Sequence, residues 1–196
     1  MLKITVIKLD HDFVFEKYLQ LFSLDVQKKI LSYRFRIDQL RSFTSELLKY
    51  YYLAKFLNIP FSEIKIVVTD LGKPILENEL NNIHFSISHS GDYVAIAVSD
   101  QLVGIDIEKI DSNISILEIG QHIFSPSENS AINGELNNFF MLWTKKESLF
   151  KALGTGFIND YYNKTKLTID LFEKTPDYII FSTLFYKDYY LSIAIK

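Results

Sequence analysis

The sequence predicts an α+β protein of two similar lobes, each a small, mainly antiparallel sheet with a packed helix, related by a pseudo-two-fold axis. The order strand, helices, strands occurs about twice along the 196 residues, and 48% of these residues are hydrophobic, enough for a buried core. We expect an N-terminal lobe of residues 1–100 and a C-terminal lobe of residues 101–196. The lobes should pack tightly around a site at their junction, because no linker rich in Gly, Ser or Pro separates them.

The first half opens with a strand candidate and three helical stretches. The strand is residues 2–9, and the helices fall near residues 12–22, 25–35 and 38–57. The third helix is the clearest, because its apolar side chains recur every three or four residues and Asn58-Ile59-Pro60 stops it. Asp38 is expected to cap its start.

Strand candidates fill the middle of the chain. Residues 64–69 are short and β-branched, and a turn at residues 70–74 follows them. Residues 84–88 and 93–99 are expected to pair around His89-Ser90-Gly91-Asp92, and residues 103–108 supply another strand.

The second half is helical before it returns to strands. Ser125-Pro126-Ser127-Glu128 has the form of a capping box with Pro at the first helical position. A long helix follows over residues 136–153 and ends at Gly154-Thr155-Gly156. Three strand candidates then close the chain, at residues 166–170, 178–185 and 189–195.

Composition excludes several classes of protein. The absence of Cys rules out disulfides and thiolate metal sites and fits a cytoplasmic protein. The start of the chain does not read as a signal peptide, and no apolar run approaches the roughly 18 residues of a membrane span. A net charge of -3 argues against a nucleic-acid partner. We expect a monomer, because two lobes can supply both walls of a cleft.

Two carboxylates share one face of a predicted strand. In Gly104-Ile105-Asp106-Ile107-Glu108, the alternation of a strand directs Asp106 and Glu108 to the same side. Their α-carbons would lie roughly 6.5 Å apart, so their oxygens can converge on one cation. Taken alone, such a pair is more often an exposed strand face with ordinary charges.

A third acid lies on the long helix. Trp143, Glu147 and Lys151 are four residues apart and form one stripe beside buried apolar positions. A simple helix salt bridge between Glu147 and Lys151 is the alternative. The glycine-bracketed turn that follows lets backbone approach a ligand closely, which favours a site.

Three carboxylates without His or Cys make an oxygen site that suits Mg²⁺. Magnesium shares its shell with phosphates, so the pattern predicts a diphosphate substrate and further cations to bind it. His89, Lys73 and Lys151 are the candidates. The segment His84 to Gly91, which includes Ser88, adds hydroxyls and backbone N–H groups that can contact phosphate oxygens.

These segments carry a resemblance to a known family. Residues 85–90, 104–108 and 143–151 look like the three signature motifs of 4′-phosphopantetheinyl transferases, in family order, and Gly72-Lys73-Pro74 matches a weaker fourth. The chain length resembles the two-lobed, surfactin-synthetase-activating type. The sequence departs from the family at Ser86, where many relatives have Asn, and at Thr44-Ser45-Glu46, where a glycine is expected.

The resemblance implies a substrate, a reaction and residue roles. Coenzyme A would bind between the lobes, and its 4′-phosphopantetheine arm would move to a serine of an acyl or peptidyl carrier protein. The metal ligands for Mg²⁺ would be Asp106, Glu108 and Glu147. Coenzyme A would contact Lys28, Arg41, Lys73, Ser88, His89 and Lys151. The catalytic residues would be Glu147, Lys151 and Glu128.

Two questions stay open at this point. The acceptor of the serine proton is either Glu147 or Glu128, and the alternative role for Glu128 is only to close the capping box. The alternatives to the transferase are another magnesium-dependent phosphotransferase or diphosphate hydrolase that uses the same acids, and an inactive module that binds carrier proteins.

Overall fold

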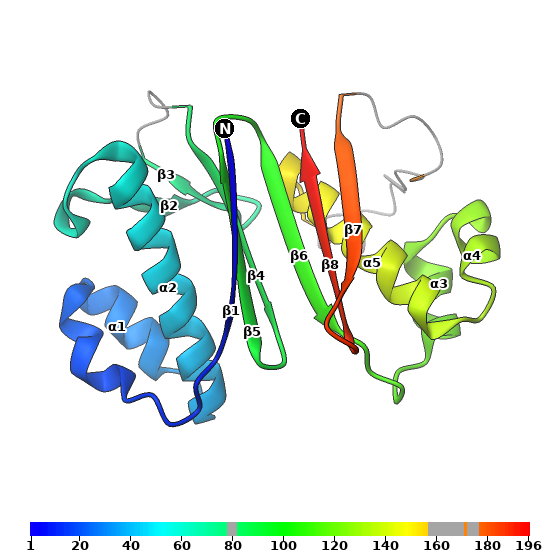
Figure 1. The fold of residues 1–196 in the computed structure, drawn as a ribbon, viewed down its shortest axis with the longest axis horizontal. Helices are drawn as coiled ribbons and strands as arrows, with labels where there is room; N and C mark the ends of the chain where they lie inside the picture. Colours follow the sequence, from blue (N-terminus) through cyan, green and yellow to red (C-terminus); the bar gives the residue numbers. More distant parts are fainter. Residues whose placement is uncertain (78–81, 157–170, 172–176) are drawn as a thin grey trace.

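The computed structural model describes residues 1–77, 82–156, 171 and 177–196. Two three-stranded antiparallel sheets form its centre (Figure 1). The N-lobe sheet has the order β1 (Leu2–Lys8), β5 (Tyr93–Ser99), β4 (His84–Ser90). The C-lobe sheet has the order β6 (Val103–Lys109), β8 (Tyr189–Ile195), β7 (Ile179–Phe185). The α+β class with two sheets, each with helices, is confirmed.

One long helix covers the outer face of each sheet, so the described residues form four layers: α2, N-lobe sheet, C-lobe sheet and α5 (Figure 1). Helix α2 spans Arg36–Leu57 and α5 spans Leu136–Leu153. The shorter helices are α1 (Leu24–Leu31), α3 (Ile116–Ile123) and α4 (Pro126–Ile132), with 3₁₀ helices η1 (Phe15–Leu21) and η2 (Phe61–Glu63). A hairpin of β2 (Ile66–Val68) and β3 (Pro74–Leu76) lies beside the N-lobe sheet.

Strand β5 explains how the layers join. Every residue of β5 is buried. Alternate side chains face opposite ways along a strand, so Val94 and Ile96 enter the core under α2, while Ala95 and Ala97 enter the core between the two sheets. Small alanines at this interface let the sheets approach closely, which places the lobe junction beside β4 and β6.

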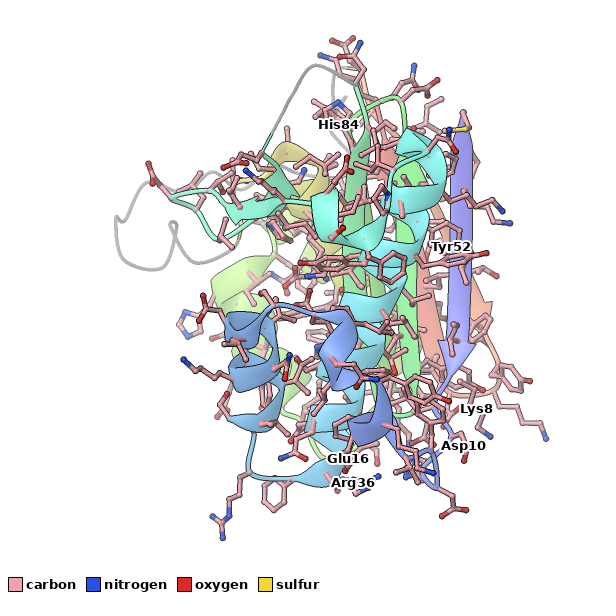
Figure 2. The ribbon with its side chains drawn as sticks, turned by 90° about the vertical axis from the view of Figure 1, so that its left-hand side faces the viewer. Lys8, Asp10, Glu16, Arg36, Tyr52 and His84 are labelled. Atoms are coloured by element: carbon pink, nitrogen blue, oxygen red, sulfur yellow. The ribbon has the colours of Figure 1, made fainter. Side chains whose placement is uncertain are left out.

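Side-chain contacts fix the N-terminal helices on this scaffold. Figure 2 shows α2 in front of the N-lobe sheet, with Tyr52 beside β1, where its hydroxyl lies within hydrogen-bond distance of the Thr5 hydroxyl. Glu16 of η1 pairs with Arg36 at the start of α2, and Arg36 also donates to the carbonyl of Phe13 at 3.0 Å. These contacts anchor the beginning of α2.

Several local expectations from the sequence need correction. The helical stretch expected near residues 12–22 is shorter and is the 3₁₀ helix η1. Asp38 does not cap α2: the cap is Phe35, without a side-chain hydrogen bond, and Asp38 pairs with Arg41 at 2.7 Å. Strand β3 was not expected. The strand candidate at residues 166–170 lies outside the described residues.

Other expectations are confirmed. The capping box is present, with the Glu128 backbone N–H donating to the Ser125 hydroxyl at 3.2 Å and Ser125 N–H donating to the Glu128 carboxylate at 2.8 Å. Helix α5 ends at Gly154 in the left-handed conformation, with φ 77°. Within the described ranges, none of the helices combines the length and apolar character needed to cross a membrane.

Candidate active site

A polar pocket of about 610 Å³ opens between the lobes. Strand β4 and helices α1 and α2 supply its N-terminal wall, and β6 and α5 supply its C-terminal wall. The predicted site residues that line it are Ser88, His89, Asp106, Glu108, Glu147 and Lys151. The carboxylates of a strand and a distant helix therefore share one cavity, as the sequence predicted.

A close backbone approach at Gly104 brings the strand and the helix together. A β-carbon at Gly104 would lie 1.9 Å from the carbonyl oxygen of Ser148 and 2.4 Å from the amide nitrogen of Ala152. Only a glycine leaves room for α5 to sit so close to β6. The result is that Glu147 and Lys151, on either side of this contact, lie against the strand that carries Asp106.

Asp106 is the central acid of the pocket and is 1% exposed. Its Oδ1 accepts hydrogen bonds from the Ser88 hydroxyl at 2.8 Å and from the Lys151 ammonium at 2.7 Å. Its Oδ2 is buried and has no hydrogen-bond partner among the described residues. A buried carboxylate oxygen without a partner is costly, so this atom is suited to a cation ligand.

Glu108 and Glu147 have strongly perturbed acidity. Burial raises the pKa of each to about 7, and the negative charge of Asp106 adds to the rise. Ser90 donates to Glu108 at 2.8 Å, and Lys151 opposes the rise in the pKa of both acids, but these contacts do not compensate. Lys151 alone therefore does not make the surroundings of Glu108 and Glu147 favourable for two further negative charges.

The carboxylates of Asp106, Glu108 and Glu147 do not lie close enough together to hold one metal ion. Among the described residues, no group of three or more His, Cys, Asp and Glu side chains is close enough to hold a metal ion. The ammonium of Lys151 lies 2.7 Å from Oδ1 of Asp106, which leaves Oδ2 as the oxygen that a cation can reach. The partnerless Asp106 oxygen, the raised pKa values of Glu108 and Glu147, and the all-oxygen donors fit a hard divalent cation.

His89 and Arg41 stand on the N-lobe side of the pocket. His89 has an exposed edge, but the protein atoms around its ring and the positive charges of Arg41 and Lys151 lower its pKa, which favours a neutral imidazole that can gain a proton beside an anion. Arg41 does not reach the described lining of the polar pocket. Its guanidinium donates to the carbonyl of Gly91 at 2.8 Å and to Asp38, which steadies the turn after His89.

Of the two neighbouring lysines of α1, the predicted Lys28 does not line the pocket. Lys28 is exposed, lies 3.9 Å from Asp25 and does not line the pocket. Lys29 does line it, and donates to Glu46 at 3.0 Å; Glu46 also pairs with buried Lys49 at 2.7 Å. The sequence did not identify Glu46 and Lys49 as pocket residues, because an i, i+3 pair of this kind is common on helix surfaces.

Lys73 and Glu128 lie away from the polar pocket. The ammonium of Lys73 donates to the carbonyl of Ala152 at 2.9 Å, which ties the hairpin to the end of α5, and burial lowers its pKa. Glu128 is fully buried, pairs with Lys146 at 2.6 Å and accepts a hydrogen bond from the backbone of Leu171 at 2.9 Å. Both oxygens of Glu128 are therefore engaged in structural contacts. These contacts favour the structural role of Glu128 in the capping box over a role as a base.

Comparison with known proteins gives this architecture a class. The family described as "4'-phosphopantetheinyl transferase, N-terminal" matches residues 11–101, and the "4'-phosphopantetheinyl transferase superfamily" matches residues 102–193. The chain therefore belongs to the 4′-phosphopantetheinyl transferase superfamily and is of the two-domain type, as its motifs predicted.

Individual relatives support the same assignment. The chain is 41% identical over 143 residues to 4'-phosphopantetheinyl transferase gsp of Aneurinibacillus migulanus, a match that covers 67% of this chain and 58% of the relative. It is 32% identical over 146 residues to 4'-phosphopantetheinyl transferase Sfp of Bacillus subtilis, covering 72% and 64%. The human L-aminoadipate-semialdehyde dehydrogenase-phosphopantetheinyl transferase is 36% identical over 120 residues, covering 53% and 39%. The chain thus spans only about three fifths of the bacterial relatives.

Proposed function

We propose that this protein transfers the 4′-phosphopantetheine arm of coenzyme A to a serine of an acyl or peptidyl carrier protein. The observation that carries the proposal is the polar pocket between the lobes, because Asp106, Glu108, Glu147, His89 and Lys151 all line this one cavity. Family membership and the names of the relatives support it. Coenzyme A supplies the diphosphate that such a pocket suits.

The proposed reaction is a phosphoryl-type substitution. The hydroxyl oxygen of the carrier serine bonds to the β-phosphorus of coenzyme A, and the bond from that phosphorus to the bridging oxygen breaks. Adenosine 3′,5′-bisphosphate leaves with the electron pair, and the serine proton passes to a base. Such chemistry depends on positioning and on charge neutralisation more than on covalent help from the protein.

We assign Asp106, Glu108 and Glu147 to a Mg²⁺ ion, and the fit rests on the oxygen of Asp106 that lacks a partner. When bound, the ion would orient the diphosphate and neutralise charge that grows on its oxygens. The three acids would repel one another less in the same event, because a divalent cation offsets the negative charge that raises the pKa values of Glu108 and Glu147.

Phosphate contacts are assigned to Lys151, His89 and Ser88. Lys151 and Ser88 both donate to Oδ1 of Asp106, so both lie at the edge of the acidic cluster. Neutral His89 can take up a proton when an anion approaches, which would strengthen its hydrogen bond to phosphate. On the N-lobe wall, Lys29 and Lys49 face the same cavity and are assigned to the nucleotide end in place of Lys28.

Glu147 is the proposed acceptor of the serine proton. Both oxygens of Glu128 already have donors, from Ser125, Lys146 and Leu171, whereas Glu147 lines the pocket itself. A general base has to lie within hydrogen-bond reach of the hydroxyl that it activates. Arg41 and Lys73 are given supporting roles, since their contacts hold the turn after His89 and the hairpin beside the pocket.

One assay tests the proposed function. The protein is incubated with coenzyme A, Mg²⁺ and a panel of carrier proteins, and each carrier is weighed by mass spectrometry. We expect one carrier to gain the mass of the phosphopantetheine arm on its serine, and the gain to disappear with a chelator. Cleavage of coenzyme A without any carrier would instead indicate a hydrolase. Binding of a carrier without modification or cleavage would indicate an inactive module.

We further propose that the protein acts as a monomer, because residues of one chain form both walls of the polar pocket. Sedimentation of the active protein during turnover tests this. A dimer whose dissociation abolishes transfer would contradict it.

A further inference from the structure

Three serines of β4 join the two lobes beside the polar pocket. Ser86, Ser88 and Ser90 alternate along the strand, so their side chains point to the same side of the N-lobe sheet, and each contacts β6. Strand β4 pairs with β5, and β6 pairs with β8, so both β4 and β6 lie at the edge of their own sheet. The serine hydroxyls therefore make polar contacts across the lobe junction.

Two of these serines satisfy the backbone of β6. An edge strand presents N–H groups that have no partner strand. The N–H of Ile105 donates to the Ser86 hydroxyl at 3.0 Å, and the N–H of Lys109 donates to the Ser90 hydroxyl at 3.0 Å. These bonds fix the position of β6 along β4, and β6 is the strand that carries Asp106 and Glu108.

Ser90 differs from Ser86 in a second contact. Its hydroxyl also donates to Oε2 of Glu108 at 2.8 Å. Because a backbone N–H can only donate, the Ser90 oxygen accepts from Lys109, and its hydrogen is directed to the carboxylate. Ser90 thus ties the side chain of Glu108 to the backbone of the next residue. Within the described part of the chain, the Ser86 hydroxyl makes no such bond to an acid.

Glu108 is held by contacts from two other elements. Ser90 of β4 is one donor, and Trp143 of α5 is another side-chain donor. Ser90 and Trp143 line a cavity next to the polar pocket, and Glu108 lines both cavities. Ser90 therefore contacts the carboxylate from outside the polar pocket, as expected of a group that orients a ligand without entering its site.

We propose that Ser90 is a positioning residue of the metal site, whose hydroxyl holds the Glu108 carboxylate where it can bind a divalent cation. This inference rests on the proposed function, which assigns Glu108 to Mg²⁺. Glutamate has several rotatable side-chain bonds, so a contact that fixes its carboxylate in advance lowers the entropy lost on metal binding. Ser90 acts through Glu108 and needs no contact with coenzyme A or with the carrier protein.

Metal affinity tests this role without relying on transfer. Mn²⁺ is titrated into wild type, Ser90→Ala, Ser90→Thr and Ser86→Ala, and the unbound ion is measured by electron paramagnetic resonance. Coenzyme A is left out, because its diphosphate binds Mn²⁺ in solution. Ser86→Ala is the matched control, since it removes the same kind of bond to the β6 backbone without affecting an acid. Ser90→Thr keeps the hydroxyl, and the half-buried position beside an open cavity leaves room for a methyl group.

Ser90→Ala should bind Mn²⁺ about tenfold more weakly than wild type, at the low end of the roughly 10–100-fold loss usual for an orienting partner, because Trp143 still holds Glu108. Ser90→Thr should stay within about threefold of wild type, and Ser86→Ala within about twofold. The proposal is overturned if Ser90→Ala binds Mn²⁺ as tightly as wild type. It is also overturned if Ser86→Ala loses as much affinity, or if Ser90→Thr does not restore it.

A second measurement separates a metal effect from a damaged fold. Transfer to a carrier protein is followed over a range of Mg²⁺ concentrations for wild type and Ser90→Ala. The deficit of the variant should be largest at low Mg²⁺ and should shrink as Mg²⁺ rises, because excess ion compensates for a weaker site. A deficit of the same size at every Mg²⁺ concentration would show a merely structural role and contradict the proposal.

These tests also separate the inference from the function on which it rests. If wild type modifies a carrier while Ser90→Ala keeps its affinity for Mn²⁺, the positioning role is wrong and the transferase stands. If no carrier is modified while Ser90→Ala alone loses Mn²⁺, Ser90 orients a metal ligand of a protein with another activity. Wild type that retains no Mn²⁺ would contradict both the metal site and this inference.

Discussion

The substitution Glu147→Gln should make the metal-free protein more stable while it disables the site. Burial and the charge of Asp106 raise the pKa of Glu147 from 4.5 to about 7. A carboxyl whose pKa is raised on folding costs stability once it ionises. The cost is absent well below pH 4.5, grows as pH rises between 4.5 and 7, and is complete above pH 7. Glutamine keeps the shape and removes the charge.

The size of the effect follows from the shift. A rise of about 2.5 pKa units at about 1.4 kcal/mol per unit gives about 3 kcal/mol at pH 8, and below about 1 kcal/mol at pH 5. The assay is urea unfolding at both pH values with a chelator present. The control is Glu63→Gln, an exposed acid in η2 whose loss should change the free energy of unfolding by less than about 0.5 kcal/mol.

The same variant should lose its response to magnesium. Wild type should gain stability on addition of Mg²⁺ and coenzyme A, because ligands that bind only the folded state stabilise it. Glu147→Gln should gain much less and should not transfer the arm. The reasoning would be refuted if the variant were no more stable than wild type at pH 8, or if its advantage were as large at pH 5.

Three further predictions concern the supports of the site. Gly104→Ala should destabilise the fold by more than about 2 kcal/mol in thermal unfolding, since its β-carbon would collide with the backbone of α5. The control is Gly134→Ala, because nothing lies within 4 Å of a β-carbon at that position. It should cost only the strain of its positive φ, about 1 kcal/mol. Lys146→Met should cost about 3–5 kcal/mol by urea unfolding because it strands buried Glu128, and the added change Glu128→Gln should recover part of that loss. The pKa of His89, lowered in the free protein, should rise when coenzyme A binds; an unchanged pKa in NMR titration would remove His89 from the phosphate site.

The chemistry of the site was easier to predict than its N-lobe wall. Asp106 and Glu108 share a face because strands alternate, and Glu147 and Lys151 share a stripe because helices repeat every 3.6 residues. Both rules are local, so the sequence alone places these side chains. The small residue at Gly104, which lets the two elements touch, was also visible in the motif, although its contact with α5 was not.

The choice between Lys28 and Lys29 could not be made from the sequence. One residue along a helix turns a side chain by about 100°, so the answer depends on how α1 is rotated against α2. That rotation is set by tertiary packing, such as the contact of Lys29 with Glu46. Glu46 and Lys49 could not be identified as pocket residues for a similar reason. In the sequence they form an i, i+3 pair that resembles an ordinary surface ion pair, and only the structure shows that they line the pocket.

Short elements were also beyond local reasoning. Strand β3 has three residues and begins at Pro74, and it exists because it pairs with β2 across the hairpin. The segment Phe15–Leu21 forms the 3₁₀ helix η1. Its Phe15 is buried in the core, where its ring packs against that of Phe43. Non-local contacts decide such segments more than propensity does.

The most direct test of the account is whether a divalent ion sits beside the diphosphate on the carboxylates of β6 and α5. Mn²⁺ is substituted for Mg²⁺, and the ³¹P resonances of bound coenzyme A are recorded for wild type and Asp106→Asn. We predict strong paramagnetic broadening of the diphosphate signals in wild type, weaker broadening of the 3′-phosphate, and loss of the effect in the variant. Diphosphate signals that stay sharp in wild type, or that broaden equally in Asp106→Asn, would contradict the proposed metal site.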